Sequence, residues 1–196
     1  MESITVAKSP VHSLTPHDPV GAPAVPYLGM LLRAAESADA MSVARVHVRS
    51  WQSAYRDLLP GEYLDQLRPE DRAQRYDFET RDLLKPQTIV ATEAGEIRGF
   101  ATTAPSRDAD LAGYGELFAL YVDPDYWGRG IGVALVSAAR DRLVTLGFGN
   151  ALLWVLRGNL RADRFYRNDH WAPDGLQRTD TVWGLTVNEI RYQRKL

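Results

Sequence analysis

The sequence contains no cysteine, and this absence excludes several kinds of chemistry. Without a thiol the chain has no disulfide, no thiolate metal site and no cysteine nucleophile. A reaction catalysed by this protein therefore cannot pass through a covalent intermediate on a protein thiol.

Two other features are missing, and they concern location and partners. No window approaches the roughly 18 consecutive apolar residues of a membrane-spanning helix, and the N-terminus lacks the basic and then apolar segments of a signal peptide. We therefore expect a cytoplasmic protein without membrane contacts. Lysine and arginine form no run and the formal net charge is -2, so nucleic acid is not an expected partner either.

A chain of 196 residues, of which 45% are hydrophobic, can bury one substantial core. We therefore predict one globular domain over residues 27–196. Residues 1–26 hold five prolines and no sustained apolar period, which predicts a disordered or loosely packed tail. His12 and His17 lie in this tail without a third histidine or a clustered carboxylate, so no metal site is predicted.

Hydrophobic periodicity predicts the order of the secondary structure. Ala40, Ala44, His47 and Trp51 recur at steps of three and four, which is one face of an amphipathic helix that runs to about residue 58. The other predicted elements are short helical pieces after Pro60 and Pro69, a hairpin around Ala94-Gly95, a strand over 116–122, a helix over 130–145, a strand over 151–156, a short helix over 161–168 and, after a polar loop, a last strand over 187–196. This order predicts an α/β protein with a mixed sheet and a strand-helix-strand crossover in its middle.

Three glycines stand at alternating positions between a predicted strand and a predicted helix, at Gly128, Gly130 and Gly132. A tight turn needs one or two glycines, so three exceed that need. Unpaired N–H groups face outwards at the start of a helix, where roughly half a positive charge also lies, and together they bind anions well. The turn therefore predicts a phosphate or pyrophosphate site.

The spacing of the turn excludes two common nucleotide sites. A P-loop requires a lysine followed by a hydroxyl residue, and neither is present here. A dinucleotide fingerprint requires a small residue at position 133 or 135, where this chain has Val133 and Leu135.

The segment Trp127-Gly-Arg-Gly-Ile-Gly132 resembles the acetyl-CoA loop of the GNAT acyltransferase superfamily, with Trp127 at a position that is usually Gln or Arg. Upstream, GELFALYVDP is similar to the fourth strand of that family. Downstream, WVLRGNLRADRFYRNDHW is similar to its fifth strand and following helix, with His170 at the usual glycine position. Histidine adopts a left-handed backbone more readily than most residues do. The resemblance covers about residues 31–196, and HVRSWQSAYRDLLP is similar to a bacterial subgroup of mostly uncharacterised members.

The resemblance implies the GNAT fold, in which helices flank a mixed, mostly antiparallel central sheet that is splayed between its fourth and fifth strands. It also implies acetyl-CoA as co-substrate, no metal, and direct transfer of the acetyl group to a primary amine of a small molecule. An amino acid, a polyamine and an amine antibiotic are the candidate acceptors. The alternatives are acetylation of a protein lysine or N-terminus, and a catalytically silent CoA-binding sensor module.

The resemblance assigns residues to acetyl-CoA in three places: the fourth strand, the glycine turn and the start of the last helix. These residues are Leu120, Tyr121, Val122, Trp127, Gly128, Arg129, Gly130, Ile131, Gly132, Val133 and Asn159. Backbone N–H groups near Leu120 and Val122 would polarise the thioester carbonyl, as preorganised donors do in an oxyanion site. Asn159 would bind the pantetheine arm or cap the helix that follows it.

Two residues hold the positions of catalytic groups in related enzymes. Tyr166 is at the position of the general acid, and a phenol of pKa about 10 suits a thiolate of pKa about 8.5. Glu116 is at the position of a catalytic glutamate. A carboxylate and an ammonium are mismatched by about six pKa units, roughly 8 kcal/mol, so a base would need a raised pKa or a water relay. Glu116 could instead bind the ammonium as a counter-charge, or simply end an exposed strand.

Two further expectations concern the acceptor and the assembly. Trp51 and Tyr55 lie on the helix that helps to wall the acceptor pocket in this family, although a spacing of four residues is also typical of core packing. The last strand, 187–196, could pair across a homodimer if it is an exposed edge.

Overall fold

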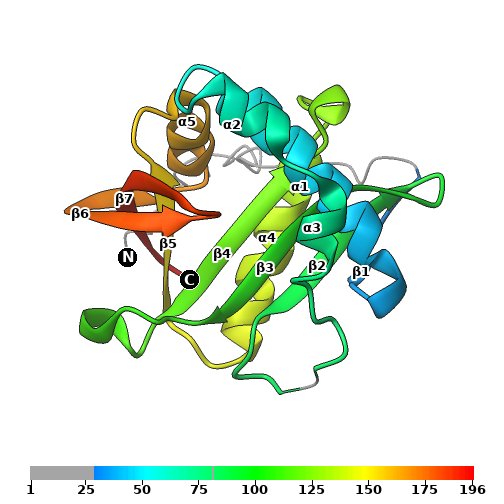
Figure 1. The fold of residues 1–196 in the computed structure, drawn as a ribbon. Helices are drawn as coiled ribbons and strands as arrows, with labels where there is room; N and C mark the ends of the chain where they lie inside the picture. Colours follow the sequence, from blue (N-terminus) through cyan, green and yellow to red (C-terminus); the bar gives the residue numbers. More distant parts are fainter. Residues whose placement is uncertain (1–28, 81) are drawn as a thin grey trace, which may run out of the picture.

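The computed structural model describes residues 29–80 and 82–196, and a seven-stranded sheet lies at its centre (Figure 1). The strand order is β1-β2-β3-β4-β5-β7-β6, and every neighbouring pair is antiparallel except β4 and β5. The predicted mixed, mostly antiparallel sheet is confirmed. The predicted tail over 1–26 lies outside the described residues.

The predicted helices and the hairpin are present at nearly the expected positions. The strands are β1 (Met30–Ala34), β2 (Gln87–Glu93), β3 (Glu96–Pro105), β4 (Gly115–Val122), β5 (Asn150–Leu156), β6 (Ala172–Val182) and β7 (Leu185–Lys195). The α-helices are α1 (Ala40–Ala54), α2 (Gly61–Gln66), α3 (Pro69–Ala73), α4 (Ile131–Thr145) and α5 (Leu160–Asn168). None of these helices is long and apolar enough to cross a membrane.

Helices cover both faces of the sheet because alternate strand residues point to opposite sides. On one face, the stripe of α4 that includes Leu135 and Leu143 packs against alternate residues of β3 and β4 such as Ala101 and Leu117. On the other face, Val43 and Val46 of α1 pack against Val90 and Phe100. The sheet is therefore fixed between α4 and α1, with β4 near its middle.

Strands β4 and β5 pair over only two residue pairs, Gly115 with Ala151 and Glu116 with Leu152. Beyond these pairs the two strands separate, so the predicted splay between the fourth and fifth strands is confirmed. β4 also carries a bulge near residue 118, because Thr103 pairs with Leu117 whereas Thr102 pairs with Ala119. A bulge bends its strand and increases the local twist.

Two sequence-based expectations at the C-terminal end were wrong. The polar segment expected to be a loop forms β6, an edge strand whose side chains are mostly exposed. An exposed strand has no apolar alternation to reveal it. The last strand is not an edge, since β7 lies between β5 and β6. β1 forms the opposite edge of the sheet, and no strand had been predicted at its position.

Candidate active site

The gap between β4 and β5 leaves backbone donors without a neighbouring strand. The N–H of Asp123 donates to the carbonyl of Arg98 at 2.8 Å, which shows which residue pairs of β3 and β4 are hydrogen-bonded and which are not. Because bonded and non-bonded pairs alternate in an antiparallel ladder, the N–H groups of Leu120 and Val122 point away from β3. They face the side from which β5 has diverged.

The carbonyl of Val122 supports the same alternation. It accepts hydrogen bonds from Ser50 Oγ at 2.9 Å and from Trp127 Nε1 at 2.8 Å instead of from β3. The indole of Trp127 therefore anchors the glycine turn to the end of β4. The guanidinium of Arg161 lies 3.5 Å from the centre of the same ring, so Trp127 also contacts the first turn of α5.

Backbone conformation accounts for two of the three glycines. Gly128 and Gly130 have φ angles of 76° and 79°, which side chains rarely tolerate. Gly132 has no such angle, and a Cβ there would lie 3.4 Å from the Phe165 ring, which is ordinary contact. Neither strain nor packing requires glycine at position 132, so the absence of a side chain there leaves the backbone open to the approach of a bound molecule.

The start of α4 presents free donors beside this turn. Gly130 is the N-cap and provides no side-chain cap, and Ala134 makes the first helical bond, from its N–H to the carbonyl of Gly130 at 3.0 Å. The N–H groups of Ile131, Gly132 and Val133 therefore have no acceptor within the helix. Together with the positive end of the helix dipole they can bind a phosphate group. The guanidinium of Arg129 lies nearby, over the ring of Tyr126.

Helix α5 carries Asn159 at its start and Tyr166 near its end. Asn159 Oδ1 accepts a hydrogen bond from the N–H of Ala162 at 3.0 Å, which confirms its capping role and leaves its amide NH₂ group for a ligand. Tyr166 is buried, and this burial is the main cause that raises its pKa. The nearby Tyr121 adds to the increase. The phenol therefore holds its proton at neutral pH. His170, with φ of 63°, adopts the left-handed backbone expected after this helix.

Tyr166 belongs to a group of aromatic side chains from three elements. Trp51 Nε1 of α1 donates to Tyr121 Oη at 3.0 Å, and Tyr55 Oη lies 3.5 Å from Tyr121 Oη. Burial raises the pKa of Tyr55 and Tyr121, and the charge of Tyr166 adds to the increase at Tyr55. The structure thus brings Trp51, Tyr55 and Tyr121 into contact, and Tyr166 lies near enough to affect the pKa of Tyr55.

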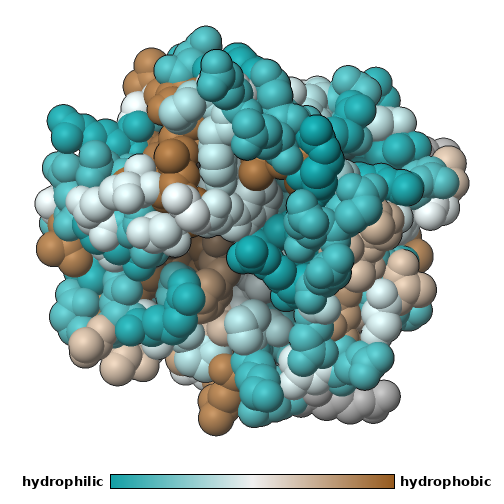
Figure 2. Space-filling model, viewed as in Figure 1, coloured by the Kyte–Doolittle hydropathy of each residue, from teal (hydrophilic) through white to brown (hydrophobic). Residues whose placement is uncertain are grey.

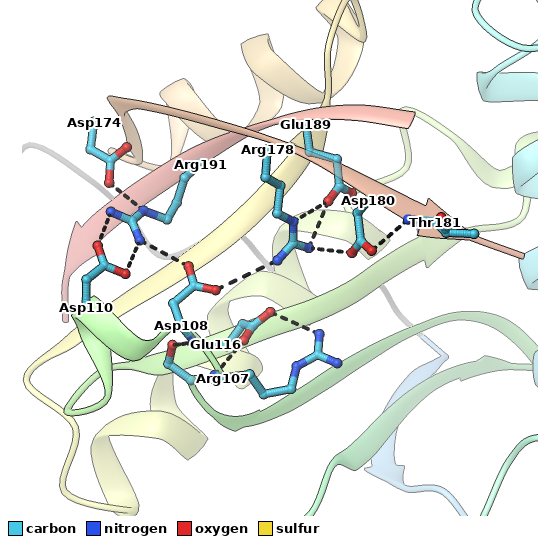
Figure 3. A network of polar contacts seen from close by, with 11 residues as sticks. Arg107, Asp108, Asp110, Glu116, Asp174, Arg178, Asp180, Thr181, Glu189 and Arg191 are labelled. Carbon is cyan, nitrogen blue, oxygen red and sulfur yellow. Dashed lines mark hydrogen bonds and ion pairs between the residues drawn. The ribbon is translucent and has the colours of Figure 1, made fainter. Parts of the chain in front are cut away.

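Glu116 lies apart from this group, at the last β4–β5 pair. Its buried carboxylate accepts the N–H of Arg107 at 3.2 Å and lies 3.5 Å from the Arg107 guanidinium. Burial raises the pKa of Glu116, and the contacts with Arg107 oppose that increase. Figure 3 shows Glu116 next to a charge network that continues from Asp108 to Arg178 and Arg191. Leu120 is four residues further along β4, about 13 Å at the rise of an extended strand.

A cavity of about 380 Å³ lies on the α1 side of β4. Figure 2 shows this face hollowed over β4, between the β6–β7 hairpin and α3. Trp51 and Trp183 stack in its wall with ring centres 4.2 Å apart, and Tyr121 is shared with the aromatic group around Tyr166. Trp51 is 5% exposed, so it is both a core residue and a wall of the cavity. Tyr55, Tyr166 and Glu116 do not line this cavity.

Sequence reasoning missed several residues of this region. His47 was placed on a core face of its helix, whereas it lines the cavity with Arg72 and Trp183. Glu189 was not singled out, yet its charge contributes to the raised pKa of both Tyr55 and Tyr121. The sequence did contain one signal for Glu189. Val187, Glu189 and the buried Arg191 lie on one face of a strand, where apolar residues are typical, so two charged residues there are unusual.

His47 is held neutral inside the cavity wall. Arg72 Nε donates to His47 Nδ1 at 3.3 Å and Tyr76 Oη lies 2.6 Å from the same nitrogen, so Nδ1 accepts and carries no proton. Burial, and then the charge of Arg72, lower the pKa of His47 well below its usual value.

A model of the acetyltransferase (GNAT) family matches residues 48–170, a span that includes β4, the glycine turn and α4. The chain belongs to this family and is an acetyl-CoA-dependent N-acetyltransferase. It therefore has an acetyl acceptor.

Two relatives show the range of the similarity. The uncharacterized N-acetyltransferase YuaI of Bacillus subtilis (strain 168) is 30% identical over 128 residues, which cover 65% of this chain and 72% of YuaI. A mycothiol acetyltransferase of Mycobacteroides abscessus is 31% identical over 119 residues, which cover 59% of this chain but 38% of that protein.

Solved structures share the fold. PaiA N-acetyltransferase from Thermoplasma acidophilum, in complex with coenzyme A, has a TM-score of 0.64 and 19% identity, covering 86% of this chain and 99% of that chain. YncA from Salmonella typhimurium, with its cofactor acetyl-CoA, has a TM-score of 0.63 and 20% identity, covering 85% and 94% of the two chains. The predicted GNAT fold is confirmed by these neighbours.

The neutral state of His47 makes stability depend on pH. Below pH 6.5 the unfolded chain protonates this histidine while the folded chain does not, so the stability that is fully present above pH 6.5 is lost as the pH falls. Between pH 7.5 and pH 5.5, the wild type should lose about 1.4 kcal/mol more than a His47→Gln variant. Urea unfolding of both proteins at the two pH values measures this difference. Equal losses in the two proteins would contradict the neutral histidine.

Proposed function

We propose that this enzyme transfers the acetyl group from acetyl-CoA directly to a primary amine of a small molecule. The observation that carries the proposal is the aromatic cavity of about 380 Å³ beside β4. Its volume is near the lower end of the ~300–1,000 Å³ that is typical of small-ligand sites. A partly enclosed cavity of this size suits a small amine better than an extended peptide.

In this proposal acetyl-CoA occupies the gap between β4 and β5. Its pyrophosphate accepts hydrogen bonds from the N–H groups of residues 131–133, which have no acceptor within the helix. The thioester carbonyl accepts from the outward N–H groups of Leu120 and Val122, which stabilise the negative charge that develops on its oxygen. The cavity on the α1 side of β4 then holds the acceptor.

The reaction needs one proton acceptor and one proton donor. The neutral amine attacks the thioester carbon, a C–N bond forms and the C–S bond breaks, and the departing thiolate takes a proton. Tyr166 supplies that proton, because burial keeps its phenol protonated at neutral pH. Its proximity to Tyr121, which is shared with the cavity wall, supports this role.

The Tyr166→Phe variant should lower kcat by on the order of 100-fold or more, because the thiolate then leaves without a positioned acid. The affinity for acetyl-CoA, measured by calorimetry, should fall by at most about tenfold, since a single neutral hydrogen bond contributes at most ~1.5 kcal/mol. Tyr114→Phe, on the loop before β4, is the matched control. A kcat within twofold of the wild type for Tyr166→Phe would rule out Tyr166 as the general acid.

We assign to Glu116 the uptake, through bridging water, of the proton that the ammonium form of the acceptor loses before its neutral amine attacks. The backbone spacing from Leu120, up to about 13 Å for an extended strand, favours a relay through water over direct transfer. The pKa of Glu116, raised by burial, reduces its mismatch with an ammonium group.

The Glu116→Gln variant should lower kcat/KM by on the order of 100-fold near pH 7. The loss should shrink as the pH rises towards 9.5, because more of the acceptor is then already neutral. Release of free CoA, read with a thiol reagent, gives the profile without background because the chain has no cysteine. Glu62→Gln on the exposed side of α2 is the control. A higher KM with unchanged kcat at every pH would instead show a counter-charge.

The same assay tests the proposed class of acceptor. Amino acids, polyamines, aminoglycosides and lysine peptides are compared at equal concentration. Release of CoA driven by a small amine supports the proposal, and release driven only by lysine peptides would move the assignment to protein acetylation.

A further inference from the structure

The cavity beside β4 carries an excess of positive charge. Arg72, Arg75 and Lys85 line it, whereas Asp77 is the only carboxylate in its wall among the residues that the structure describes. Asp77 accepts the N–H of Glu79 at 3.0 Å. Within residues 29–80 and 82–196, neither Asp77 nor any other carboxylate forms an ion pair with the three cations.

Arg72 is fixed in the wall of the cavity by three aromatic side chains. Its guanidinium lies 4.6 Å from the ring centre of Trp183 and 5.2 Å from that of Tyr76, and its Nε donates to His47 Nδ1 at 3.3 Å. A guanidinium held in this way loses little further freedom when it binds a planar anion. His47 is neutral, so it does not balance the charge of Arg72.

Two other arginines on the same side of the protein, Arg178 and Arg191, are balanced by carboxylates. Arg178 pairs with Glu189 at 2.8 Å, and Arg191 pairs with Asp174 at 2.6 Å and with Asp110 at 2.8 Å. Figure 3 shows these carboxylates converging on the two guanidinium groups. Arg72 is only half-buried and keeps part of its hydration, so it is free to bind an anionic group of a ligand in the cavity, as Arg178 and Arg191 bind carboxylates of the protein.

The rest of the wall is apolar and aromatic. Trp51, Trp183, Phe100 and Phe118 line the cavity, and Tyr121 connects it to the aromatic group that contains Tyr166. Such walls bind an apolar body, while the cations bind a charged end.

We propose that the acetyl acceptor is an amine that also carries a carboxylate, of the size and kind of an apolar or aromatic amino acid. Its carboxylate binds Arg72, supported by the positive charges of Arg75 and Lys85, and its amine faces Tyr121 and β4. Polyamines and aminoglycosides, which carry several positive charges, are rejected by these three cations. This inference rests on the proposed transfer to a small amine.

The test compares each acid with its amide, which differs only at the carboxylate. The probes are L-phenylalanine, L-leucine and L-methionine, their amides, spermidine and kanamycin. The amine of an amide is less basic, so more of it is neutral, and a preference for the acid cannot arise from amine reactivity. We expect kcat/KM to be on the order of 10- to 100-fold higher for at least one acid than for its amide.

Variants connect this preference to the cavity. Arg72→Gln should remove most of the preference by raising KM for the acid, with little change for the amide, and Arg72→Lys should restore part of it. Lys85→Gln, at a residue without a described ion pair, gives a smaller loss of the same kind and does not disturb the contacts of Arg72. Arg56→Gln removes an exposed charge outside the cavity, paired with Asp65 at 2.8 Å, and should keep the preference.

A binding measurement without acetyl-CoA separates this inference from the proposed function. Trp51 and Trp183 line the cavity, so a bound acid should change the intrinsic tryptophan fluorescence. Acid binding that is lost in Arg72→Gln and kept in Arg56→Gln supports the site even if no amine is acetylated, and only the proposed function would then fail. Equal use of acid and amide, preferred acetylation of spermidine or kanamycin, or no binding of any acid would each overturn the inference.

Discussion

The pairing of β4 with β5 lasts for two residue pairs, and the site depends on where it stops. β4 stays bonded to β3 along its whole length, and α1 and α4 pack against its two faces. β5 is bonded instead to β7, so neither strand can move to close the gap. The N–H groups of Leu120 and Val122 are left facing an opening, and an unpaired backbone donor away from water requires a partner. In the proposed complex, the thioester carbonyl is that partner.

The two sides of β4 are adapted to different parts of the reaction. On the α4 side, the glycine turn and the free N–H groups of the first helical turn can bind a phosphate group without any side chain. On the α1 side, aromatic rings and cations form a cavity of small-molecule size. Tyr121 lies close enough to Tyr166 to raise the pKa of its phenol, and in the proposed reaction these two tyrosines connect the two sides. Most carboxylates near the β6–β7 hairpin pair with Arg178 or Arg191, whereas Arg72 has no carboxylate partner among residues 29–80 and 82–196.

The parts of the fold that the sequence predicted well are local. Helix α4 and the turn before it follow from apolar periodicity and three glycines, and both occur within 18 residues of chain. Strand β6 was missed because it is exposed and polar, and its partner β7 was expected at an edge. The cavity could not be predicted, since it brings His47 and Arg72 against Trp183, which lies in the turn of a hairpin whose first strand had been expected to be a loop. Of the two roles predicted for Asn159, the capping of α5 is confirmed, and it could be predicted because a cap depends only on its next three residues.

The measurement that tests the central claim most directly is amide hydrogen exchange with and without acetyl-CoA, resolved by residue. The account predicts that acetyl-CoA slows exchange at Leu120 and Val122 on β4 and at residues 131–133 on α4, because each of these N–H groups gains an acceptor. Amides of β4 that already bond to β3, such as that of Tyr121, should change little. Slower exchange at the start of α4 without any change at Leu120 and Val122 would contradict the claim that the gap between β4 and β5 holds the thioester.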